Sequence, residues 1–251
     1  MWYSDKSVRR RMVLTKSKVA LISQITLAAR LSMSILSTCS SPRLEQEEPV
    51  IGVSLHDLCQ REHSQSPLVY RLLIQHLTDN CVDIEGILRL SGGSDDIAQL
   101  EKAITKRSFS LQELKDFDPH AITSTLKGLF RRLPVLLIPK SVNDRIEQLL
   151  RQSTPNFKLV LSVYQVIAFL KEKYPEHFEV FRMLCRLFAE IVNRSPTNKM
   201  VLQNVLTCFV ESVQCCPAIF SCALQNQGLF FDSFVFYYSY YLLYLIVNSI
   251  V

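Results

Sequence analysis

The sequence predicts an all-α protein, a helical bundle flanked by a basic N-terminal arm and a hydrophobic C-terminal tail. Apolar residues recur at three- and four-residue spacing through the middle of the chain, which is the period of an amphipathic helix. Capping residues and prolines precede these stretches, and regularly spaced short strand patterns are absent. We therefore divide the 251 residues into an arm (1–48), a helical domain (49–216) and a tail (217–251).

The composition is that of a globular protein, with 48% hydrophobic and 20% charged residues. The chain has only 6 glycines and 10 prolines, which excludes a fibrous or broadly disordered protein. Its eight cysteines form no C-x-x-C pair and no Cys/His ligand spacing. We therefore expect free thiols and no bound metal.

Positive charge is concentrated in the arm. Residues 1–44 contain eight Lys or Arg and one acidic residue, Asp5, whereas the net charge of the whole chain is +5. The rest of the chain has no positive excess, so we expect no nucleic-acid partner. Two interpretations of the arm stay open: a mitochondrial presequence, and a mobile, disordered arm that touches anionic membrane. Gln24 and Arg30 interrupt its apolar part, which argues against a secretory signal.

Two helices are predicted in the first half of the domain. The first follows Ser66-Pro67, because a capping residue before a first-turn proline is a start signal. The second is capped by Ser94-Asp95-Asp96, which places acidic side chains at the positive end of the helix dipole. Their apolar stripes are Leu68, Leu72, Leu73, His76 and Leu77 in the first, and Ile97, Leu100 and Ile104 in the second.

Further helices are predicted in the second half. Asp118-Pro119 opens one in the same way, and Pro134 ends it. Ser141 is expected to cap the next helix, and three long segments follow at 156–173, 176–194 and 197–215. Neighbouring antiparallel helices of this kind can build one core. The expected buried face of the helix after Asp118 is Ile122, Leu126, Leu129, Phe130 and Leu133.

The stretch EGILRLSGG, residues 85–93, places Arg89 inside an apolar run that is bracketed by glycines. A charged side chain in such a run needs a partner or has to point out of the fold. The glycines permit backbone turns that would direct it outward, toward something the chain binds. The alternative is an ion pair with a nearby carboxylate, Asp83 or Glu85.

Lys127 and Arg131 stand four residues apart, on one face of the helix that follows Asp118. Like charges at this spacing destabilise an isolated helix by roughly 0.2–0.5 kcal/mol. The pair is either a solvated basic face or a cationic patch for an anionic group or acidic partner. Two asparagines are open to several interpretations: Asn198 as a helix cap, and Asn204 as a surface amide or a core hydrogen-bonder.

Taken together, these segments resemble the GTPase-activating domain of the Rho-GAP family. The order is G-I-L-R-L-S-G, then L-K-x-x-x-R-x-L-P about forty residues on, then N-K-M-x-x-x-N. The resemblance covers residues 51–216, begins at IGVSLHDL and fades after Phe209. The family has an aromatic residue at the position of Leu88. Leucine is also apolar, so this difference keeps the apolar character of the position.

The resemblance implies a helical bundle that speeds GTP hydrolysis by a Rho-class small GTPase in its GTP-bound state. It implies that Arg89 is the catalytic arginine finger, that Lys127 and Arg131 support it, and that Asn204 contacts the GTPase. Asn198 would shape the preceding turn. The domain would need no cofactor and would have no activity alone, because GTP and Mg²⁺ belong to the partner. We expect a cytoplasmic location, with membrane association through the arm or the tail.

The sequence departs from the family after Asn204, where the usual Gly-Pro pair is missing and a helix could continue. The family's remaining C-terminal helices are not recognisable. Residues 229–251 are instead apolar and rich in Tyr and Phe, with Asp232 as the single charge. This segment could cross a membrane, pack as a C-terminal helix or form an ill-ordered extension. The alternative function is a catalytically impaired GTPase-binding module, tethered to a membrane in one version.

Overall fold

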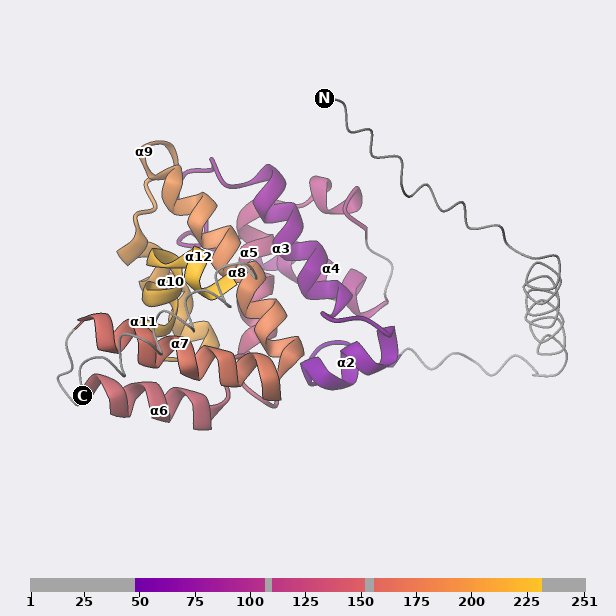
Figure 1. The fold of residues 1–251 in the computed structure, drawn as a ribbon. Coiled ribbons are helices and arrows are strands. Elements are labelled where there is room, and N and C mark those ends of the chain that lie inside the picture. The colour runs from indigo at the N-terminus through magenta and orange to yellow at the C-terminus, as the bar shows by residue number, and fades with distance from the viewer. Residues whose placement is uncertain (1–47, 107–109, 152–155, 232–251) are drawn as a thin grey trace, which may run out of the picture. The chain divides into compact units, whose positions relative to one another are not determined.

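The structure, a computed structural model, describes residues 48–106, 110–151 and 156–231. These residues form helices and connecting loops without a strand, as predicted for an all-α fold (Figure 1). Residues 1–47 and 232–251 lie outside the described residues, and with them most of the predicted arm and of the segment considered for membrane crossing. Within the described ranges, no helix is both long enough and apolar enough to span a bilayer.

The helices follow one another with short connections. The first part of the domain contains α2 (Leu55–Glu62), α3 (Leu68–Asn80), α4 (Ser94–Thr105), the 3₁₀ helix η1 (Glu113–Asp116) and α5 (Pro119–Arg131). The second part contains α6 (Lys140–Arg151), α7 (Asn156–Lys173), α8 (Pro175–Asn193), α9 (Ser195–Asn198), α10 (Leu202–Val213), α11 (Pro217–Gln225) and α12 (Gln227–Phe231).

The predicted start of α5 is confirmed in detail. The carboxylate of Asp118 accepts a hydrogen bond from the backbone nitrogen of Ala121 at 3.0 Å, and Pro119 occupies the first turn. The prediction that Ser141 caps α6 is wrong, because α6 begins at Lys140 and includes Ser141. The carbonyl of Pro139 already accepts hydrogen bonds from the next turn, so the helix starts directly after this proline.

The last predicted helical segment, 197–215, is interrupted. Lys199 adopts a left-handed backbone with φ 61° and ends α9, and α10 begins at Leu202. From there α10 runs to Val213 without a break, as the missing Gly-Pro pair led us to expect. Gln214, with φ 52°, is the left-handed residue that ends it.

The core is organised around α8, which contacts α2, α3, α7, α9, α10 and α11. Figure 1 shows α8 crossing the domain, with α9 at one of its ends and α2 beside the other. The ring of Phe188 lies 4.9 Å from that of Phe209 and 5.4 Å from that of Phe220, measured between centroids. Aromatic pairs of this kind add about 0.5–1.5 kcal/mol each beyond area burial. They join α8 to α10 and α11.

The packed helices extend past residue 216, the limit set for the domain from the sequence. α11 contributes the fully buried Ile219, Phe220 and Ala223, and packs against α7, α8 and α10. Phe230 of α12 is also fully buried, with its ring centroid 5.9 Å from that of Tyr164. The described start of the predicted tail therefore covers apolar surface of the bundle.

Candidate functional site around Arg89

The Arg89 loop, residues 81–93, joins α3 to α4 through consecutive turns. The backbone nitrogens of Arg89 and Leu90 donate to the carbonyl of Gly86 at 2.8 and 2.9 Å. Gly86 and Leu88 both have left-handed backbones, with φ 69° and φ 67°, which is ordinary for glycine and rare for leucine. The Leu88 side chain is fully buried. The core therefore fixes this turn, and the next residue, Arg89, lies at the surface.

The side chain of Arg89 is exposed, and among the described residues it makes no hydrogen bond or ion pair. Asp83, one of the two carboxylates considered as its partner, instead pairs with Arg194 at 2.6 Å. Glu85 is exposed and forms no ion pair within the described ranges. The guanidinium of Arg89 is thus free for an anionic group outside this part of the chain.

Lys127 of α5 holds the Arg89 loop. Its Nζ donates a hydrogen bond to the carbonyl oxygen of Leu88, directly before Arg89. Burial lowers the pKa of Lys127, and the nearby charge of Arg131 lowers it as well, whereas Cys208 and Glu211 of α10 act in the opposite direction. Lys127 therefore places a half-buried amine at the base of the turn that carries Arg89.

Arg131 and Asn204 are connected to this region through α10, which packs against α5. Arg131 is exposed, and its Nη1 donates to the Oγ of the buried Ser212 at 3.3 Å. Asn204, on the first turn of α10, is partly exposed, and its Nδ2 donates to the carbonyl of Lys199 at 3.3 Å. The structure thus joins Lys127 to the Arg89 loop directly, and Arg131 and Asn204 only through neighbouring elements.

Asn198 fastens the Arg89 loop to the end of α8. This asparagine is fully buried, and its Nδ2 donates to the carbonyls of Val82 and Ile191, both at 2.7 Å. Its Oδ1 accepts from the nitrogen of Met200 at 2.8 Å, and its own carbonyl accepts from the nitrogen of Gly86 at 2.9 Å. From the sequence, Asn198 was expected only as a helix cap or as a residue that shapes the preceding turn, because its partner Val82 is 116 residues away in the chain.

The other end of the loop is fixed by a close backbone approach. A Cβ atom at Gly92 would overlap the backbone of Ala121, so no other residue fits without displacement. The nitrogen of Gly92 also donates to the Oγ of Ser124 at 3.2 Å. The Arg89 loop is therefore held by α5 on one side and by Asn198, the last residue of α9, on the other.

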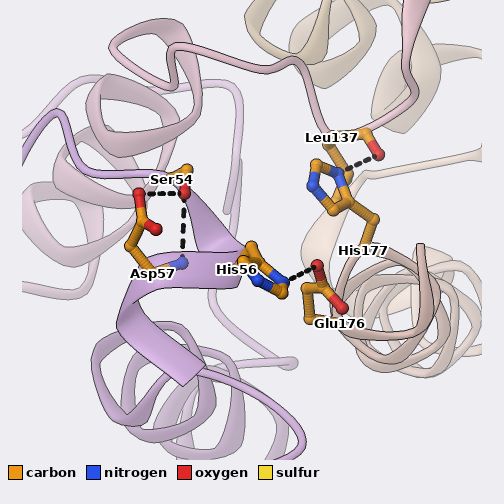
Figure 2. Close-up of polar contacts among 6 residues, drawn as sticks. All are labelled: Ser54, His56, Asp57, Leu137, Glu176 and His177. Atoms are coloured by element: carbon orange, nitrogen blue, oxygen red, sulfur yellow. Dashed lines mark hydrogen bonds and ion pairs between the residues drawn. The ribbon is translucent and has the colours of Figure 1, made fainter. Parts of the chain in front are cut away.

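The cavity between α2 and the start of α8, of about 610 Å³, lies in another part of the domain and is lined by His56, Cys59 and Glu176 among others. Figure 2 shows His56 beside Glu176, and His177 beside Leu137. His56 Nδ1 lies 3.1 Å from Glu176 Oε1, and Nδ1 of the buried His177 donates to the Leu137 carbonyl at 3.0 Å. These contacts attach α2 and the loop after α5 to α8. Within the described ranges, no three potential ligands are placed to hold a metal ion.

The fold and this site define a helical domain with a braced arginine at its surface, which pairs with no side chain among the described residues. The sequence model of the RhoGAP domain matches residues 67–230, and the chain belongs to the RhoGAP family. This confirms the resemblance found in the sequence.

Similar proteins include a probable inactive serine/threonine-protein kinase of Dictyostelium discoideum, 32% identical over 74% of this chain and 15% of that protein. Rho GTPase-activating protein gacT of the same organism is 29% identical over 73% of this chain and 18% of its own length. The chain thus spans less than a fifth of either relative. The crystal structure of human Rho GTPase activating protein 15 has the same fold, with a TM-score of 0.63 at 21% identity over 78% of this chain and 100% of that one.

Proposed function

We propose that this chain accelerates GTP hydrolysis by a Rho-class small GTPase in its GTP-bound state, with Arg89 entering the partner's nucleotide pocket. The observation that supports this most is the Arg89 side chain, unpaired among the described residues, on a turn braced by Lys127 and Asn198. Membership of the RhoGAP family, and the name of the relative gacT, support the class of partner.

The chemistry requires positive charge where negative charge develops on the transferred phosphoryl oxygens. Arginine suits this role because its guanidinium stays protonated and donates two parallel hydrogen bonds. An arginine supplied in trans raises the hydrolysis rate of small GTPases by roughly 10³–10⁵-fold. Fixing the backbone before docking reduces the conformational entropy that is lost on binding.

Under this proposal, Lys127 holds the turn, and Arg131 and Asn204 meet polar groups of the GTPase. GTP and Mg²⁺ are carried by the partner, so the domain needs no cofactor of its own. We also propose a cytoplasmic location, with anionic membrane as a second contact of the arm or tail.

Single-turnover GTP hydrolysis by a panel of GTP-loaded Rho-class GTPases tests the proposal. The wild-type chain should accelerate at least one of them, and Arg89→Ala should remove most of that acceleration, about 10³-fold or more. Arg151→Ala is the matched control, because this arginine is exposed at the end of α6. No acceleration by the wild type, or an Arg89→Ala variant of equal activity, would contradict the proposal.

A GTPase-binding module without catalysis is the second candidate. The observation that favours it is α10, which carries Asn204 and continues to Val213 where the family usually turns at a Gly-Pro pair. This reading predicts that the chain binds a GTP-loaded GTPase without accelerating hydrolysis. A charge reversal, Lys127→Glu, that left affinity unchanged would argue against this interface in either form.

A further inference from the structure

Two large apolar side chains are exposed in the Arg89 loop and in the segment that follows α9. Leu90, the next residue in the chain, is 47% exposed, and Val201, at the N-cap of α10, is 50% exposed. The other exposed large hydrophobic residues in the described part of the chain range from 37% to 42%. Leu90 and Val201 are therefore the two most water-exposed of this set.

The segments that carry these two residues are hydrogen-bonded to each other. The nitrogen of Leu90 donates to the carbonyl of Gly86, and the nitrogen of Gly86 donates to the carbonyl of Asn198, both at 2.9 Å. Val201 follows Asn198 by three residues. The neighbouring Leu88 and Met200 are both fully buried, so the core is filled from this region without Leu90 or Val201.

We propose that Leu90 and Val201 make the apolar contact with the GTP-bound GTPase and close the phosphate site to bulk water once Arg89 has entered it. This inference rests on the proposed function. Their exposure has a cost in the free domain that docking removes, because apolar surface leaves water. Exclusion of water also strengthens the interaction between a guanidinium and phosphate oxygens.

The partner surface that fits this pair is apolar or uncharged and lies at the edge of the nucleotide pocket. An acidic surface would serve Arg89 but would leave Leu90 and Val201 against charged, hydrated groups. Leu90 and Val201 would therefore discriminate between GTPases, since a GTPase with a charged residue at this edge would bind less tightly.

The test measures single-turnover hydrolysis against the concentration of the domain, which separates the half-saturating concentration from the maximal rate. Leu90→Asn and the double variant Leu90→Asn/Val201→Thr keep side-chain volume close to the original while adding polarity. The matched control is Leu68→Asn, because Leu68 is 40% exposed and lies at the first residue of α3, opposite the end that leads into the Arg89 loop.

We expect the half-saturating concentration to rise about tenfold in the double variant, which corresponds to about 1.4 kcal/mol of binding free energy. The maximal rate should change less than threefold, whereas Arg89→Ala lowers the maximal rate. An unchanged half-saturating concentration, or an equal rise in Leu68→Asn, would overturn the inference.

A failure of the proposed function gives a different pattern. If the wild type binds a GTP-loaded GTPase without acceleration, the catalytic proposal is wrong, and the apolar contact is tested by the affinity of the same three variants. If the wild type binds no GTPase, both proposals are overturned. If sedimentation shows that the double variant loses self-association rather than GTPase affinity, the pair contacts a second copy of the chain, which also overturns the inference.

Discussion

Replacing Asn198 by alanine should destabilise the domain by about 3–7 kcal/mol. The substitution removes three hydrogen bonds that the side chain makes at 2.7, 2.7 and 2.8 Å. The Ile191 carbonyl still accepts from the nitrogen of Arg194. The Val82 carbonyl and the Met200 nitrogen lose the partner they have in the described structure.

The magnitude follows from these two groups. A buried polar group left without a partner costs about 1–3 kcal/mol, and the third lost hydrogen bond adds about 1 kcal/mol. Val82 is 5% exposed and Met200 is fully buried, so water reaches neither of them easily. A loss of this size is a large part of the 5–15 kcal/mol that stabilises a typical domain.

Urea unfolding followed by helical circular dichroism measures this change. Asn226→Ala is the control, because Asn226 makes one side-chain hydrogen bond, at 2.9 Å to the Cys222 carbonyl at the end of α11. We expect about 1 kcal/mol or less from the control. A loss below about 1 kcal/mol in Asn198→Ala would refute the reasoning that this residue anchors the Arg89 loop.

Three further predictions concern residues outside this anchor. Lys127→Met keeps the aliphatic stem but removes the hydrogen bond to the Leu88 carbonyl, so the maximal hydrolysis rate should fall at least about tenfold in single-turnover assays; an unchanged rate would contradict the bracing role. Gln214→Gly should stabilise the domain by about 0.5–1 kcal/mol in urea unfolding, because the left-handed backbone at this exposed helix end disfavours a side chain; a destabilised variant would contradict this. Burial lowers the pKa of His177. Its contribution to the free energy of unfolding is therefore complete above the unfolded pKa of about 6.5 and is lost as the pH falls toward the lower folded pKa. The slope of this loss is no more than about 1.4 kcal/mol per pH unit. His177→Gln should flatten the stability profile below pH of about 6.5, apart from the slope that His76 contributes in the same direction, and an unchanged profile would exclude this source.

Most of the helix predictions rested on capping residues and prolines close to the helix ends. α5 begins and ends as expected because Asp118, Pro119 and Pro134 act within one or two turns of their own positions. Lys199 was not anticipated as a break, since a left-handed lysine has no signature in the sequence comparable to that of glycine. Pro217 is an ordinary start signal, but the domain limit expected at residue 216 assigned it to the tail.

The candidate site was predictable only in part, because its contacts join residues that are far apart in the sequence. The sequence showed that Arg89 needed a partner or an outward position, but the choice depended on Asp83, whose partner Arg194 lies 111 residues away. The position of Lys127 followed from the helical period, whereas its hydrogen bond to the Leu88 carbonyl joins residues 39 positions apart. Contacts across such separations are set by the packing of α5, α8 and α10 rather than by neighbouring residues.

The backbone of Leu88 lies in a region that costs an L-residue about 1–2 kcal/mol, and complete burial of its side chain offsets that cost. Position 88 therefore has to meet two demands, an apolar volume and an unfavourable backbone twist. Glycine would adopt the backbone twist without cost but would supply no apolar volume. A leucine with an extended backbone would supply the volume but not the twist. The direction in which Arg89 points is consequently determined by the packing of the buried Leu88 side chain. A substitution in the interior that let this twist relax would turn the guanidinium elsewhere, even with every surface residue unchanged.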